Sequence, residues 1–204
     1  MTKNITKRDD LTVAIMAGGK SSRMGRNKSF VDLDGKLMIE RVLATVAPLS
    51  THQIIITNSP LLYEPFNLPM FSDLYPDHGP LAGIYTAVHH ATTPYILIVA
   101  TDMPWLNAYL LEFLIQLRQE AEVVVPRWQK FPEPLHAVYS KAVLPAIKQS
   151  LDAKKLKIIR FFNEVTVRYV EREEIEMFDK NGRSFANINT PEELKEARKG
   201  DGKK

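Results

Sequence analysis

The sequence predicts a single α/β domain with a mostly parallel sheet and helices on both faces. Apolar runs of strand length alternate along the chain with amphipathic stretches of helix length, which is typical of parallel strands joined by helices. The chain has 204 residues, enough to bury one sizeable core and too few to favour two domains. We assign the domain to residues 11–199 and expect flexible polar tails at residues 1–10 and 200–204.

Each expected element follows from a local pattern. Short apolar runs predict strands, apolar residues at helical spacing predict helices, and the Asp34-Gly35 pair bounds a short segment at residues 30–33. Thr190-Pro191-Glu192-Glu193 is a capping box with proline at the first helical position, which predicts a last helix up to residue 199. The expected strands are 11–16, 53–57, 69–72, 95–100, 122–126, 135–139 and 165–170, and the other expected helices are 37–47, 81–91, 107–120, 141–151 and 155–163.

Composition excludes several classes of protein. A formal net charge of +3 without a long basic tract does not imply nucleic acid. The absence of cysteine excludes disulfides, thiolate catalysis and cysteine-bound zinc. No apolar run is long enough to cross a bilayer, and no charged-then-apolar leader is present. We therefore expect a soluble, cytoplasmic protein that does not contact a membrane.

A glycine-rich, basic loop follows the first expected strand. The adjacent Gly18 and Gly19 allow the backbone to approach an anion closely, and Arg23 and Lys28 are among the cations beside them. The loop is not a P-loop, since Ala14 stands where that motif needs glycine. It is not a dinucleotide fingerprint either, because that motif needs Gly-x-Gly-x-x-Gly. The pattern indicates a different kind of nucleotide-phosphate site.

Polar side chains follow the later strands, where parallel strands end at one edge of a sheet. Asp102 follows a buried run, where a carboxylate is costly unless it is paired or bound to a cation. Mg²⁺ accepts one or two carboxylates and completes its shell with water and phosphate oxygens; the simpler role for Asp102 is to cap the next helix. Asp73 can bind guanine or ribose, or be an ordinary loop residue, and Thr57 and Asn58 follow the second strand.

Other candidates are weaker. Gly79 opens a helix, so free N–H groups there can approach a ligand. Asn189 can complete a metal or phosphate shell, although helix capping is the simpler role. Lys157 belongs to a basic run that is more often a solvated helix face. His78, His89, His90 and His136 have no zinc-site spacing and are expected on the surface or in packing, and His52 is unassigned. Trp105 and Trp128 can stack on a heterocycle, although packing is the more common role.

Several motifs, taken in order, resemble one family, the molybdenum cofactor guanylyltransferases of the NTP-transferase superfamily. The resemblance covers nearly the whole chain from about residue 11 to residue 198. Each motif alone is weak, and their joint presence narrows the superfamily to the family. The motifs are Met16-Ala17-Gly18-Gly19, Arg23-Met24-Gly25 with Lys28, Asp73, Gly79-Pro80-Leu81-Ala82-Gly83, Thr101-Asp102-Met103-Pro104 and Asn187-Ile188-Asn189-Thr190-Pro191.

The resemblance implies a Rossmann-like nucleotidyltransferase sheet and a Mg²⁺-dependent reaction. In that reaction GMP passes from GTP to the terminal phosphate of molybdenum-bound molybdopterin, with release of pyrophosphate. Contacts with other proteins of molybdenum cofactor biosynthesis are also implied. By position, the resemblance implies that Lys28 contacts the GTP phosphates, Asp73 the nucleoside, and Asp102 both nucleotide and metal. The other implied GTP contacts are Met16, Ala17, Gly18 and either Thr57 or Asn58. Lys157 falls on the pterin side.

Two other readings stay open at this point. A cytidylyltransferase acting on the same pterin, or a sugar-phosphate nucleotidylyltransferase, would keep the loop and Asp102 while changing the choice of base. A nucleotide-binding module without catalysis is also compatible with the motifs, although Lys28 and Asp102 are both intact. Transfer assays with each nucleoside triphosphate distinguish the three.

Overall fold

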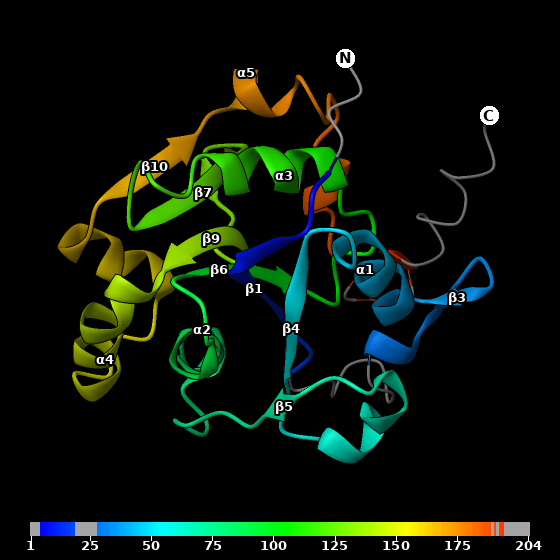
Figure 1. The fold of residues 1–204 in the computed structure, drawn as a ribbon, viewed down its shortest axis with the longest axis horizontal. Helices are drawn as coiled ribbons and strands as arrows, with labels where there is room; N and C mark the ends of the chain where they lie inside the picture. Colours follow the sequence, from blue (N-terminus) through cyan, green and yellow to red (C-terminus); the bar gives the residue numbers. More distant parts are fainter. Residues whose placement is uncertain (1–4, 19–27, 189, 191, 194–204) are drawn as a thin grey trace.

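The computed structural model describes residues 5–18, 28–188, 190, 192 and 193, and in these residues a mixed sheet of eight strands forms the centre (Figure 1). The strand order is β10-β7-β9-β6-β1-β4-β5, with β8 paired to β7. Strands β6, β1, β4 and β5 are parallel neighbours, as are β7 and β10, whereas β9 is antiparallel to both β6 and β7. The strands are β1 (Arg8–Met16), β4 (Ser50–Ile56), β5 (Met70–Phe71), β6 (Tyr95–Ala100), β7 (Val123–Trp128), β8 (Phe131–Pro132), β9 (His136–Ser140) and β10 (Val167–Val170).

Helices cover both faces of this sheet, which confirms the expected α/β class. Neighbouring side chains of β1 enter different cores: Val13 and Ile15 pack with α1 and α3, and Ala14 packs with α2 and α4. Figure 1 shows α2 and α3 on opposite sides of the sheet. The helices are α1 (Met38–Val46), α2 (Gly79–His90), α3 (Ala108–Gln116), α4 (Leu144–Asp152) and α5 (Arg172–Ile175), with 3₁₀ turns η1 (Lys28–Phe30), η2 (Pro60–Leu62), η3 (Glu64–Phe66), η4 (Lys141–Val143), η5 (Ile158–Glu164) and η6 (Arg183–Phe185).

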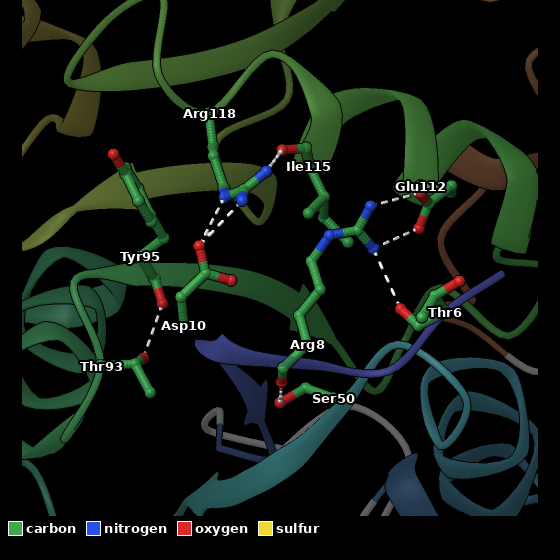
Figure 2. Close-up of polar contacts among 9 residues, drawn as sticks. All are labelled: Thr6, Arg8, Asp10, Ser50, Thr93, Tyr95, Glu112, Ile115 and Arg118. Atoms are coloured by element: carbon green, nitrogen blue, oxygen red, sulfur yellow. Dashed lines mark hydrogen bonds and ion pairs between the residues drawn. The ribbon is translucent and has the colours of Figure 1, made fainter.

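The first strand begins earlier than expected. Residues 8–10, which the sequence analysis assigned to a flexible tail, belong to β1. The Arg8 guanidinium donates two hydrogen bonds of 2.6 and 2.5 Å to the carboxylate of Glu112 on α3. Arg118 donates to the Asp10 carboxylate at 2.8 Å. Figure 2 shows both pairs above the start of β1. Polar residues extend the strand here because each has a partner far along the chain.

The short segment after η1 is a β-hairpin. β2 (Asp32–Leu33) and β3 (Lys36–Leu37) are antiparallel, and the two turn residues, Asp34 and Gly35, have φ angles of 55° and 78°. Aspartate followed by glycine is favoured in such a turn because both positions need positive φ. The turn signal in the sequence therefore marked the element correctly.

Further elements differ from expectation, among them η5 and α5. The expected helix over residues 155–163 is the 3₁₀ helix η5, which buries Phe161 and Phe162 against α4; short connections of this kind often adopt 3₁₀ geometry. The four-residue helix α5 was not anticipated, because it is too short to show a period.

The capping box near the C-terminus is present. The Glu193 N–H donates to Thr190 Oγ1, and the Thr190 N–H donates to the Glu193 carboxylate, each at 3.1 Å. The rest of the expected last helix, and the tail at residues 200–204, lie outside the described residues. Among the helices that the structure does describe, we find none with the length and apolar character needed to cross a bilayer.

Candidate functional site

The parallel strands β5, β4, β1 and β6 end at the same level. In the ladder Met16 lies beside Ile56 of β4 and Ala100 of β6, and Ile56 lies beside Phe71 of β5. The residues that follow each strand therefore emerge together at one edge of the sheet, where open α/β sheets bind ligands. Four of the segments predicted from the sequence meet here: 16–18, 57–58, 73 and 101–102.

The glycine loop starts at this edge. The N–H of the buried Ala17 donates to the Ile56 carbonyl at 2.9 Å, which extends the ladder by one residue. Gly18 is exposed, and, its chain neighbours aside, no atom of the described residues lies within 4 Å of the position that a Cβ would take there. Gly19 and Arg23 lie outside the described residues, and the chain is described again from Lys28, the first residue of η1.

Asp73 and Asn58 form a mutual pair. The Asn58 side-chain amide donates to the Asp73 carboxylate at 2.9 Å, and the Asp73 backbone N–H donates to the Asn58 side-chain oxygen at the same distance. Thr57, in contrast, is 2% exposed, and its hydroxyl accepts from the Ser59 N–H. Of the two residues after β4, only Asn58 presents its side chain at the surface, next to a second candidate.

Gly83 is a site neighbour to which the sequence analysis gave no role of its own. A Cβ on Gly83 would lie 2.1 Å from Met16 Cε and 3.5 Å from Asp73 Oδ1. Any larger residue must displace the Met16 side chain, so this glycine of α2 permits the close approach of Met16 and Asp73. Gly79, the first residue of α2, has a φ of 66° and open space around it, and therefore needs glycine for its backbone angle.

Asp102 follows β6 and is partly buried. Burial raises the pKa of Asp102 above its ordinary value; the positive charge of Lys28 and the aspartate's own backbone N–H oppose this rise, and the negative charge of Glu193 adds to it. The Ile188 N–H donates to the Asp102 carbonyl at 2.9 Å, which brings the C-terminal segment to the site. Asn189, the next residue, lies outside the described residues.

Asp102 fits a divalent cation held largely by substrate. Its carboxylate is desolvated, so a cation would stabilise the charged form. Among the described residues, no group of three or more His, Cys, Asp or Glu side chains is placed to hold a metal ion. Magnesium commonly takes one or two protein carboxylates and fills its remaining positions with phosphate oxygens and water, which agrees with a single strand-end aspartate.

The hydrogen bonds between three buried hydroxyls beneath the site were not predicted from the sequence. Tyr63 donates to Ser29 Oγ, and Ser29 Oγ and Thr101 Oγ1 share a hydrogen bond, each at 2.9 Å. All three side chains are buried. Thr101 belongs to one of the motifs quoted above, but neither Thr101 nor Ser29 signalled a hydroxyl partner, because only the folded chain brings them to Tyr63.

The remaining candidates lie away from this cluster. Lys157 is exposed and directly precedes η5. The Tyr75 hydroxyl donates to Asp152 at the end of α4 at 3.2 Å, so the loop after Asp73 contacts the element before Lys157. His136 is completely buried, with its ring centroid 4.9 Å from that of Phe185, in agreement with the expected packing role.

This fold, with its polar side chains at the carboxyl ends of parallel strands, defines an α/β protein of the nucleotidyltransferase class. The family model described as "MobA-like NTP transferase domain" matches residues 13–167, and the chain belongs to that family.

Named relatives are similar over almost their full length. The chain is 37% identical over 191 residues to the molybdenum cofactor guanylyltransferase of Desulfosudis oleivorans, covering 93% of this chain and 95% of that one. It is 35% identical over 188 residues to a probable molybdenum cofactor guanylyltransferase of Clostridium perfringens strain 13, covering 91% and 94%. The crystal structure of molybdopterin-guanine dinucleotide biosynthesis protein A from Archaeoglobus fulgidus superposes with a TM-score of 0.83 at 29% identity, covering 95% and 100%.

Proposed function

We propose that this protein transfers GMP from GTP to the terminal phosphate of molybdenum-bound molybdopterin and releases pyrophosphate. The observation that carries the proposal is that the parallel strands β5, β4, β1 and β6 all end at the same level of the sheet. The residues that follow them, Gly18, Asn58, Asp73 and Asp102, therefore lie at one edge. The chain's family and the names of its relatives support the same reaction. We further propose that the reaction takes place in the cytoplasm.

The nucleoside is assigned to Asp73 and Asn58. A carboxylate can accept both the N1–H and the N2–H₂ donors of guanine, or hydrogen bonds from a ribose. The amide of Asn58 holds the Asp73 carboxylate through the mutual hydrogen bonds described above. The free lone pairs of the carboxylate thus have a fixed direction. Met16, Ala17, Gly18, Gly19 and Gly79 complete the proposed nucleotide contacts through close backbone approach.

The phosphates are assigned to the opposite side of the same edge. Lys28 and Arg23 neutralise the charge that develops on the leaving pyrophosphate, while Asp102, with Asn189, holds Mg²⁺. When bound, the ion supplies charge neutralisation on the phosphate oxygens and helps to orient them. Lys28 lies close enough to Asp102 to lower its pKa. The two proposed phosphate-binding groups therefore act within one electrostatic site.

The acceptor needs little activation. A phosphate monoester loses its second proton with a pKa of about 6, so the attacking oxygen is already largely anionic near neutral pH. A strong general base is not required, and the protein acts chiefly by positioning and charge stabilisation. The acceptor attacks the α-phosphorus in line with the leaving pyrophosphate. Lys157 is proposed to face the pterin.

Pyrophosphate release tests this proposal. The protein is incubated with Mg²⁺, molybdenum-bound molybdopterin and each of GTP, CTP, UTP and ATP in turn. GTP should support release, and Asp102→Asn should lower the rate at least 100-fold. The matched control is Asp34→Asn in the β2–β3 turn, where asparagine tolerates the positive φ, and it should retain wild-type activity. Release with CTP or UTP but not GTP would contradict guanylyl transfer, and an unchanged Asp102→Asn rate would contradict the site.

A further inference from the structure

Three buried hydroxyls form a continuous hydrogen-bonded row. The Tyr63 hydroxyl donates to Ser29 Oγ at 2.9 Å, and Thr101 Oγ1 donates to the Met16 carbonyl at 3.3 Å. Ser29 Oγ and Thr101 Oγ1 share a hydrogen bond of 2.9 Å, in which either hydroxyl can be the donor. The row therefore connects Tyr63, Ser29, Thr101 and the carbonyl of Met16 in that order.

This row connects the segments that carry the proposed phosphate groups. Ser29 directly follows Lys28, and Thr101 directly precedes Asp102. The Met16 carbonyl, which also accepts from the Thr101 N–H at 3.1 Å, stands where β1 ends and the glycine loop starts. These hydrogen bonds thus tie the ends of β1 and β6 to the turn η1, below the surface where substrate is proposed to bind.

The far end of the row is held by aromatic packing. Tyr63 lies between η2 and η3 and has no exposed surface. Its ring centroid is 5.1 Å from that of Phe30 and 6.4 Å from that of Phe66. The Tyr63 ring is therefore held by packing against the core.

We propose that Tyr63, Ser29 and Thr101 are positioning residues that hold Lys28 and Asp102 at a fixed spacing for nucleotidyl transfer. The proposal rests on the function proposed above. Transfer between phosphates depends on geometry, and a misplacement of about 1 Å can cost about 100-fold in rate. Valine would fill the space of Thr101 almost equally well, so only a hydroxyl explains the bonds to both Ser29 and Met16.

The protein contains a matched control for the loss of a buried hydroxyl. Thr12 and Thr93 are both buried and share a hydrogen bond of 2.7 Å at the other end of the sheet, where β1 and β6 begin. Thr93 also donates to the Tyr95 carbonyl (Figure 2). Thr12→Val therefore removes the same group as Thr101→Val, but beside the start of β6, whereas Thr101 and Asp102 follow the end of that strand.

The experiment compares the full-length variants Thr101→Val, Thr101→Ser and Thr12→Val with wild type. It measures kcat for pyrophosphate release, Kd for GTP with Mg²⁺ by calorimetry, and Tm. Thr101→Val should lower kcat at least tenfold and raise Kd at least threefold, and Thr101→Ser should restore both to within threefold. Thr12→Val should lower Tm about as much as Thr101→Val, with kcat and Kd within twofold of wild type.

The outcomes separate the two proposals. If wild type releases no pyrophosphate, the proposed function fails, and the Kd series alone decides the positioning role. The positioning role would be overturned if Thr101→Val kept the wild-type kcat and Kd. It would also be overturned if Thr12→Val lost as much kcat and GTP affinity as Thr101→Val, or if Thr101→Ser restored neither. If Thr101→Val does not fold, the deciding variant is Tyr63→Phe, which keeps the ring and removes the hydroxyl that donates to Ser29. Tyr63→Phe should lower kcat at least threefold, and an unchanged kcat would overturn the positioning role.

Discussion

His136 is completely buried at the start of β9, and neither of its ring nitrogens has a hydrogen-bond partner in the part of the chain that the structure describes. Burial lowers the pKa of His136 from 6.5 to about 4, against a smaller opposite effect of the negative charge of Asp179. The unfolded chain therefore takes up a proton near pH 6.5, while the folded protein stays neutral at this position. As pH falls from 7 towards 4, the free energy of unfolding should decrease.

The size of this effect follows from the two pKa values. A difference of one in pKa corresponds to about 1.4 kcal/mol. The pKa of His136 is about 2.5 lower in the folded protein than in the unfolded chain, so the free energy of unfolding decreases by about 3 kcal/mol once the pH is below both values. Glu133, three residues earlier, acts in the opposite sense. Burial raises the pKa of Glu133 to about 7 from 4.5, so the folded state keeps a proton that the unfolded state has lost, and stability falls as pH rises. The two groups partly cancel between about pH 4.5 and 6.5.

His136→Leu removes the effect of His136 on the pH dependence of stability and leaves the effect of Glu133. Urea unfolding is followed from pH 4.5 to 8 for wild type and His136→Leu. Relative to wild type, His136→Leu should gain stability as pH falls, approaching about 3 kcal/mol near pH 4.5, and its own stability should decrease as pH rises from 4.5 to 7. A His136→Leu profile parallel to wild type would refute this account.

Two further predictions concern stability alone, each measured by chemical denaturation. Gly182→Ala should cost about 3 kcal/mol, because φ is 62° and a Cβ would lie 2.0 Å from the Trp128 ring; a loss below about 1 kcal/mol would contradict this. Arg8→Met should cost about 3 kcal/mol, because it leaves the buried Glu112 carboxylate without its cation. The double variant Arg8→Met with Glu112→Leu should recover more than half of that loss, and failure to recover would mean that the ion pair is not the cause.

The elements and the site differ in how far sequence could predict them. β6 runs over residues 95–100 as expected. A short continuous apolar run is typical of a strand that is buried on both faces of an α/β sheet. The convergence of Asp73 and Asp102 followed from topology alone, since the ends of parallel strands share an edge.

Contacts between distant residues could not be predicted in the same way. The polar start of β1 became a strand because Arg8 meets Glu112, a partner 104 residues away. Tyr63, Ser29 and Thr101 also come from three separate segments, and nothing in the local pattern of any of them signals a hydroxyl partner. Local periodicity reports which face is buried, but pairing across the fold depends on the whole packed structure.

The level ending of four parallel strands has a consequence for how such a protein can change. The ladder that aligns Met16, Ile56, Phe71 and Ala100 is set by backbone hydrogen bonds, which do not depend on the loops that follow. Loops can therefore be lengthened or exchanged while the four strand ends stay aligned. In such a protein a new base or acceptor can be selected one loop at a time, and the sheet provides an unchanged reference for each alteration.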